Sequence, residues 1–221
     1  METLWSEPGS FRLFISHVTS FKKKTSALRQ ALYRYGISAF VAHEEIEPTA
    51  VWESQILNAL TTADALLALI TKGFHRSKWT DQEIGVALGR EILIVPVRID
   101  MNPYGFLSKQ QYLRWNGKQV PGVAKRIMNV LVRNTRTSGR MAEAFVAYLE
   151  RLSDASHWTL VLHSLDLLEL LPSLNTDQLH RVQIAAEARL RVEETAHELN
   201  FFRFTQRLKQ LMERHGFSRL T

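Results

Sequence analysis

Hydrophobic positions in the first 135 residues alternate between two patterns. Short, almost continuous apolar runs are separated by longer stretches in which apolar residues recur every three or four positions. The short runs are typical of buried strands, and the longer spacing is typical of amphipathic helices. The alternation predicts strands at residues 11–17, 37–43, 64–71 and 91–99. It predicts helices at residues 25–35, 51–63, 80–89 and 121–134.

Such an alternation is typical of an open, parallel α/β sheet flanked by helices. Ligands of these sheets bind beyond the carboxyl ends of the strands. We therefore expect the polar residues that follow the predicted strands to meet at one edge, together with the loop that leads into residues 77–83. These polar residues are Ser16, His17, His43, Glu44, Glu45, Thr71 and Lys72.

From about Thr137 onwards the apolar positions follow helical spacing only, without a strand-like run. We therefore expect an α/β domain over residues 1–135 and a small all-α domain over residues 136–221, which acts as a sensor or an oligomerisation module. The helical stretches are residues 140–152, 157–171, 176–200 and 201–216.

Composition narrows the class of protein. A chain of 221 residues with 45% hydrophobic residues can bury a substantial core. It has no cysteine, which excludes a disulfide framework, a zinc–thiolate site and a cysteine nucleophile. No apolar run approaches the roughly 18 residues of a membrane span, and the first residues lack the layout of a signal peptide. A cytoplasmic protein without a membrane partner is expected.

The net charge of +6 lies entirely in the first part of the chain. Residues 1–135 hold 17 Lys and Arg against 11 Asp and Glu, and residues 136–221 hold 11 against 11. A basic surface attracts phosphate-bearing ligands or nucleic acid. However, the run Lys22–Lys24 is typical of a solvated helix start, and no zinc-finger or RNA-binding motif is present. Nucleic acid is therefore not an expected partner.

Several motifs of enzyme families are absent. The chain contains no GxGxxG, no GxxxxGK[ST] and no GxSxG, which argues against dinucleotide redox chemistry, a P-loop NTPase and an α/β-hydrolase. The sequence HEEIE at residues 43–47 lacks the second histidine of a zinc protease motif. Neither a metal nor a bound cofactor is expected.

The stretch SKWTDQEIGVALG, residues 77–89, predicts an amphipathic helix with Glu83 one turn inside it. Two interpretations of this carboxylate stay open. Thr80 to Glu83 fits a capping box, in which Glu83 folds back onto the helix N-terminus; alternatively Ser77 is the cap. A carboxylate beside the ring of Trp79, at the ligand edge of a parallel sheet, would also suit chemistry that develops positive charge.

The strand-forming and loop sequences together resemble a bacterial TIR (Toll/interleukin-1 receptor) domain. The resemblance covers roughly residues 10–135, and its most specific part is W-x-x-x-E, formed by Trp79 and Glu83. The matching segments are FRLFISH, GISAFVAHEEIEP, ALLALIT, SKWTDQEIGVALGREILIVPVRI and NPYGF. The helical half resembles no family that we can name.

This resemblance implies a flavodoxin-like fold and, as in many relatives, cleavage of NAD⁺. It implies that Glu83 is the catalytic residue and that NAD⁺ is a substrate, so that no cofactor is needed. It also implies self-association, because a second copy often completes the site in this family. The residues that it places around the substrate are Trp79, Ser16, His17, Phe40, Glu44, Trp52 and Lys78.

The expected activity is that of an NAD⁺ glycohydrolase or cyclase, which yields nicotinamide and ADP-ribose or a cyclic isomer. A fixed carboxylate suits this reaction because positive charge develops at the ribose carbon, as in glycosidases. The expected setting is bacterial anti-phage immunity, with a phage-derived or nucleotide trigger sensed by the helical domain. The alternatives are a non-catalytic TIR scaffold and a pathogen effector that interferes with host TIR signalling.

Overall fold

The computed structural model describes residues 4–41, 50–77, 79–152, 158–192 and 198–216, without the side chains of residues 50–52, 189–192 and 198–199. Its centre is a five-stranded, fully parallel sheet with the strand order β2-β1-β3-β4-β5. The four predicted strands are confirmed, and a fifth, very short strand was not predicted. The strands are β1 (Phe11–Ser16), β2 (Ile37–Val41), β3 (Ala65–Ile70), β4 (Leu93–Arg98) and β5 (Leu113–Arg114).

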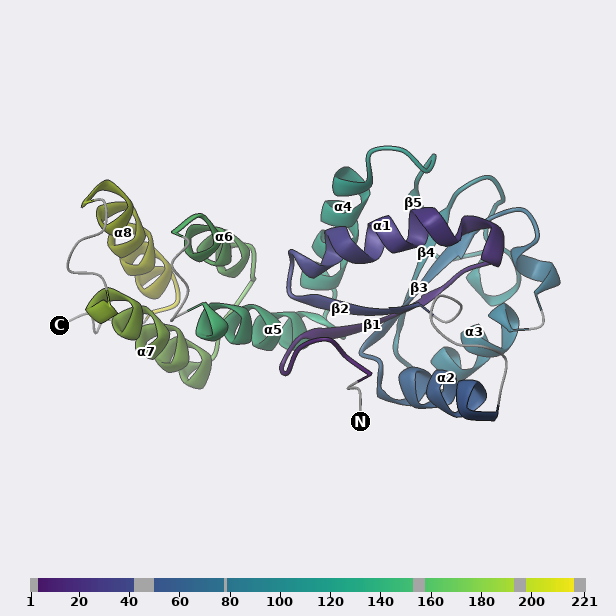
Figure 1. Ribbon diagram of the computed structural model, residues 1–221, viewed down its shortest axis with the longest axis horizontal. Helices are drawn as coiled ribbons and strands as arrows, with labels where there is room; N and C mark the ends of the chain where they lie inside the picture. The colour runs from purple at the N-terminus through teal and green to yellow at the C-terminus, as the bar shows by residue number, and fades with distance from the viewer. Residues whose placement is uncertain (1–3, 42–49, 78, 153–157, 193–197, 217–221) are drawn as a thin grey trace.

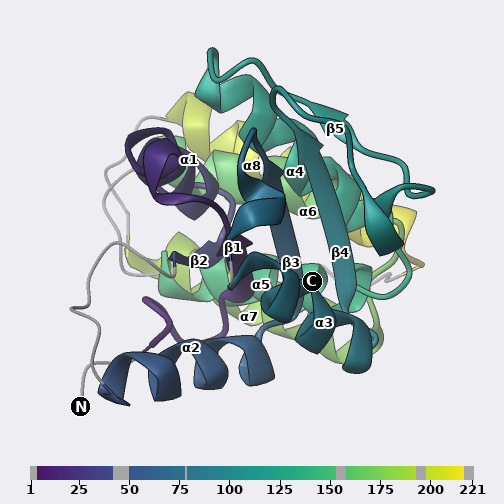
Figure 2. The ribbon, with the colours of Figure 1, turned by 90° about the vertical axis from the view of Figure 1, so that its right-hand side faces the viewer.

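Helices cover both faces of this sheet (Figures 1 and 2). One face packs against α1 (Lys22–Tyr33) and α4 (Val120–Arg133), and the other packs against α2 (Ala50–Thr62) and α3 (Thr80–Gly89). Because both faces are covered, all six residues of β3 are buried. The strand order reverses between β1 and β3, as in flavodoxin-like sheets, and the carboxyl ends at such a point are where ligands bind.

Four further helices follow, so that the described part of the chain has eight α-helices in total. The predicted boundary at residue 200 is wrong, because α7 ends earlier and α8 begins at Glu198. Figure 1 shows α6, α7 and α8 at the end of the molecule away from the sheet, with α5 between them and the strands. The four helices are α5 (Ser138–Arg151), α6 (Trp158–Glu169), α7 (Thr176–Val192) and α8 (Glu198–Arg214).

Helix α5 packs at the amino ends of the strands, opposite the edge where the strands finish. Arg140 of α5 donates hydrogen bonds to the carbonyl of Ser10 and to Asp64, which also pairs with Arg12 at 2.8 Å. The buried residues of α5 belong to the same hydrophobic cluster as Phe11, Leu13 and Ile15 of β1 and the buried apolar residues of the later helices. That residues 1–135 form a domain that folds alone stays a prediction.

Within the described residues, no helix combines the length and the apolar character that crossing a membrane would require.

Candidate functional site

Ser16 and Glu83 meet at the carboxyl end of β1. Side chains alternate along the strand, so Phe14 and Ser16 both point toward the face that α2 and α3 cover. Ser16 is the last residue of β1 and is fully buried. Its Oγ donates a hydrogen bond of 2.5 Å to Oε2 of Glu83, one turn inside α3. The contact joins the carboxyl end of a central strand to the first turn of α3, which packs over the neighbouring strands β3 and β4.

The loop before α3 holds this helix in place. Gly73 adopts a φ of 94°, in the left-handed region that favours glycine, and allows the turn after β3. Thr80, the first residue of α3, is buried and donates from Oγ1 to the carbonyl of Phe74 at 2.6 Å. Because Phe74 is itself fully buried, the first turn of α3 is tied to the core.

The capping-box interpretation of this stretch is wrong. Neither Thr80 nor Glu83 caps the helix: the hydroxyl of Thr80 turns to Phe74, and the carboxylate of Glu83 accepts from Ser16. The N-cap residue is Trp79, whose backbone N–H lies 3.4 Å from Oγ of Ser77. The hydrogen bond between Ser16 and Glu83, which lie 67 positions apart, therefore replaces the capping hydrogen bond that the local sequence pattern favoured.

Burial changes the acidity of Glu83. Its side chain is only 2% exposed. Removal from water disfavours the charged form and raises the pKa of Glu83 to about 7, although the hydrogen bond from Ser16 stabilises the carboxylate and limits the rise. Near neutral pH the acid and the carboxylate forms of this group are therefore both populated, which suits a general acid or base.

Trp79 lies on the same side of the helix start as Glu83. Its backbone is helical, and its carbonyl accepts the N–H of Glu83 at 2.9 Å, which is the first bond of the helix. Residues four apart in such a turn are neighbours on one face. The indole is partly buried against the cluster that includes Phe14 and Ile84.

His17 and Thr71 complete the polar edge of the two central strands. His17 follows Ser16 and is 1% exposed. Thr71 follows β3, is 5% exposed, and its hydroxyl has no hydrogen-bond partner among the described residues. The sequence predicted Thr71 at this ligand edge of the sheet, but the family resemblance did not include it among the residues around the substrate.

Phe40 borders the site from the neighbouring strand. It lies opposite Phe14 in the register of β1 and β2, and the two rings stack with centroids 5.5 Å apart. The ring of Trp5 approaches Phe40 edge-on at 6.4 Å. Phe40 thus lies on the sheet face that carries Ser16, one strand away, as part of an aromatic wall.

Three of the predicted residues cannot be placed in the site. Glu44 and Lys78 lie outside the described residues, and so does the side chain of Trp52, whose backbone belongs to α2. Of the predicted set, Ser16 and Glu83 are in direct contact, His17 adjoins them, and Trp79 and Phe40 border the same hydrophobic cluster. In the described part of the chain, no group of three or more His, Asp or Glu side chains is arranged to hold a metal ion.

Fold and site together define a class of protein: a parallel α/β protein of flavodoxin-like strand order, with a buried carboxyl group at the carboxyl edge of its sheet. The sequence model of the TIR domain family matches residues 13–128, more than half of the 221-residue chain. The chain therefore belongs to the TIR domain family. Trp79 and Glu83 lie inside the matched range, and helices α5 to α8 lie beyond it.

Among solved structures, the chain is similar to the crystal structure of the TIR domain of the Toll-related receptor TRR-2 from Hydra magnipapillata. The sequences are 23% identical and the TM-score is 0.45; the match covers 57% of this chain and 100% of that one. No curated protein matches the chain.

Proposed function

We propose that this TIR-domain chain cleaves the bond between nicotinamide and ribose in NAD⁺, with Glu83 as the catalytic carboxylate. The observation that supports this most is the state of Glu83: it is buried at the carboxyl edge of β1, bonded to Ser16, with its pKa raised to about 7. Carboxyl groups perturbed by burial concentrate at catalytic sites. Position and acidity thus both favour chemistry at this residue.

In the proposed reaction, the glycosidic bond breaks with its electron pair on nicotinamide, which leaves as a neutral molecule. Positive charge develops at the ribose carbon and ring oxygen, and the ionised Glu83 stabilises it. Addition of water gives ADP-ribose and releases a proton, which Glu83 can accept because its pKa is near 7. Attack by an adenine nitrogen or a ribose hydroxyl of the same molecule gives a cyclic isomer instead.

The neighbouring residues take supporting roles in this proposal. Ser16 holds the carboxylate in one orientation through its 2.5 Å hydrogen bond. Trp79 offers a flat apolar surface to the nicotinamide ring. His17 and Phe40 border the substrate from the ends of β1 and β2.

Access to Glu83 requires a rearrangement, because the side chain is 2% exposed. We propose that self-association of TIR domains supplies it, and that the helices beyond residue 136 respond to a phage-derived or nucleotide trigger in bacterial anti-phage immunity. Activity would then depend on assembly rather than on the concentration of NAD⁺ alone.

The test is nicotinamide release from NAD⁺ by the purified full chain, with and without macromolecular crowding. Glu83→Gln should reduce release about a hundredfold or more, since it removes the charge that stabilises the transition state. It should leave the melting temperature nearly unchanged or raise it, because glutamine can still accept from Ser16. Glu91→Gln, at an exposed glutamate just after the same helix, is the matched control. Absence of nicotinamide under every assembled condition would contradict the proposal.

The burial of Glu83 also favours a second candidate, a non-catalytic TIR interaction module, because a carboxyl group closed to solvent meets no substrate in this conformation. In that case Glu83→Gln would leave self-association unchanged, and neither protein would release nicotinamide. Measuring assembly by light scattering beside nicotinamide release separates the two candidates.

A further inference from the structure

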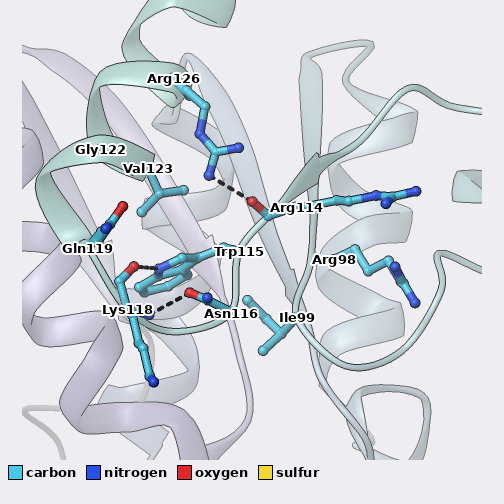
Figure 3. Close-up of a pocket in the computed structure, with 10 residues that line it drawn as sticks. All are labelled: Arg98, Ile99, Arg114, Trp115, Asn116, Lys118, Gln119, Gly122, Val123 and Arg126. Carbon is cyan, nitrogen blue, oxygen red and sulfur yellow. Dashed lines mark hydrogen bonds between the residues drawn. The ribbon is translucent and has the colours of Figure 1, made fainter.

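The loop of residues 99–112, between β4 and β5, lies near two cavities. The one at the ends of these strands is shown in Figure 3. There the side chains of Arg98 and Arg114 extend away from that of Lys118, so the charges around that cavity do not converge on one point. The other cavity lies between this loop and the first half of α3, and its volume is about 280 Å³. It is called the α3 cavity below.

Three aromatic rings line the α3 cavity: Phe74, Tyr104 and Phe106. Phe74 is fully buried, and its ring and that of Tyr104 meet edge to face with centroids 6.5 Å apart. Phe106, by contrast, is 83% exposed, although it borders a cavity whose other walls include the buried Ile84 and Leu107. An aromatic ring left in water at the rim of an apolar cavity indicates a binding site whose ligand would cover the ring.

Gly85 opens the cavity on the side of α3. A glycine inside a helix destabilises it relative to alanine, so its presence there needs a reason. The described chain supplies none: a Cβ atom at Gly85 would meet no atom within 4 Å, and the residue does not adopt a positive φ. The backbone of the helix is thus left bare where it borders the cavity, and a bound molecule can approach it closely.

The carboxylate of Asp81 is the one charged group in the described lining. Its Oδ1 accepts a hydrogen bond of 2.5 Å from the hydroxyl of Tyr104. Burial and this bond both raise the pKa of Tyr104, so its hydroxyl stays a neutral donor. Carboxylate oxygens have acceptor sites to spare beyond this single bond. No described lysine or arginine lines the cavity, although the net charge of the chain is +6. The cavity therefore favours a positively charged ligand.

We propose that the α3 cavity binds a small organic cation, a protonated amine with an apolar or aromatic body. The ammonium group lies against Asp81 and the rings of Tyr104 and Phe106, and the apolar body fills the space beside Gly85. Ring faces attract cations, and the carboxylate adds a charge-assisted hydrogen bond. A volume of about 280 Å³ suits a single ring or a short chain rather than a dinucleotide. Glu83 does not line this cavity, and binding there requires no cleavage of NAD⁺.

Titration of the full chain with benzylammonium at constant ionic strength, followed by the NMR shifts of the backbone amides, tests this proposal. We expect saturable binding of one molecule per chain. Benzyl alcohol, which has the same ring without the charge, should bind about tenfold more weakly or worse. Asp81→Asn keeps an acceptor for Tyr104 but removes the charge, and should weaken benzylammonium by a similar factor. Asp100→Asn, at an exposed aspartate after β4 and outside the cavity, should change the affinity by less than about twofold.

A second matched pair tests the space itself. Gly85→Leu fills the cavity from the side of α3 and should abolish binding. Gly89→Leu, at the last residue of the same helix, where a Cβ atom also meets nothing within 4 Å, should leave binding unchanged. Leucine forms helices better than glycine does, so thermal melting should show both variants folded. Absence of saturable binding, equal affinity for benzyl alcohol, or equal losses in the cavity and the control variants would overturn the proposal.

Discussion

Glu83 is a carboxyl group whose charge near neutral pH depends on two contacts, with the surrounding core and with Ser16. Burial favours the protonated acid, and the serine hydroxyl favours the carboxylate. Both effects act on a side chain that the catalytic proposal needs in its ionised form. The pH dependence of stability and of activity therefore reports on the same residue.

The first prediction concerns stability. The pKa of Glu83 is raised from an ordinary 4.5 to about 7 in the folded chain, so between these values the folded state binds more protons than the unfolded state. Its contribution to the free energy of unfolding therefore falls as the pH rises from 4.5 to 7, by about 3 kcal/mol. Glu83→Gln should lose this decline and be more stable than the natural chain at pH 8. Urea denaturation at pH 5, 6, 7 and 8 measures the free energy of unfolding of both proteins. The same dependence of this free energy on pH in the natural chain and in Glu83→Gln would contradict the prediction.

The second prediction concerns Ser16. Ser16→Ala removes the hydrogen bond that lowers the pKa of Glu83, so the pKa should rise further. Because the proposed reaction needs the ionised carboxylate, the rise of nicotinamide release with pH should move to a higher pH. Ser164→Ala, at a buried serine of α6, is the control and should keep the natural profile. A fall in rate without a change in the profile would mean that Ser16 acts on something other than the acidity of Glu83.

The sequence predicted that Glu83 lies at the ligand edge, and it did so from strand ends and the W-x-x-x-E motif. It could not predict the partner of Glu83. Ser16 lies 67 positions away, whereas the local pattern offered a capping box within four residues. The tertiary contact prevailed because the fold brings the hydroxyl of Ser16, at the end of β1, within hydrogen-bond distance of the first turn of α3.

At the scale of the element, α3 is held by one buried hydroxyl. Thr80→Val keeps the shape of the side chain but leaves the carbonyl of Phe74 without its donor, which should cost about 1–2 kcal/mol in the free energy of unfolding. Nicotinamide release should fall as well, because the turn that carries Glu83 loosens. Thr61→Val removes a comparable bond on the exposed side of α2 and should change stability by less than about 0.5 kcal/mol. Equal effects in denaturation experiments would contradict a special role for Thr80.

The strands could be predicted wherever burial on both faces left an unbroken apolar run, as in Ala65–Ile70. β5 escaped prediction because its two residues, Leu113–Arg114, form no pattern. Arg98 and Arg114 become neighbours only through the register of β4 with β5, which the sequence does not reveal.

Across the whole molecule, the candidate site and the helical region occupy opposite edges of one sheet. Strand β1 connects them: Arg12, near its amino end, bonds to Asp64, and Ser16, at its carboxyl end, bonds to Glu83. Asp64 is also bonded to Arg140 of α5. Strand β1 thus links the junction of Asp64 with α5 to the contact between Ser16 and Glu83, and the proposed response of the helices would reach Glu83 along this strand.

The last prediction tests this junction. Burial disfavours the charge of Asp64, but hydrogen bonds from Arg12 and Arg140 outweigh it and hold its pKa below the usual range. The stability it contributes is therefore fully present above pH 4 and is lost as the pH falls through the lowered pKa. Asp64→Asn should reduce the free energy of unfolding at pH 7 by about 2 kcal/mol, since the side chain is 7% exposed but its two arginine partners are partly in water.

Asp177→Asn is the control for that change, because Asp177 is 76% exposed and pairs with Arg181 at only 3.9 Å. It should cost less than about 0.5 kcal/mol. If Asp64 also transmits the state of the helices, Asp64→Asn should alter how strongly crowding stimulates nicotinamide release, whereas Asp177→Asn should not. If Asp64→Asn and Asp177→Asn lost equal stability in urea denaturation, the ion pairs of Asp64 would contribute no more than an ordinary surface ion pair. If Asp64→Asn reduced stability but left the stimulation of nicotinamide release by crowding unchanged, the role of Asp64 would be only to hold α5 against the sheet.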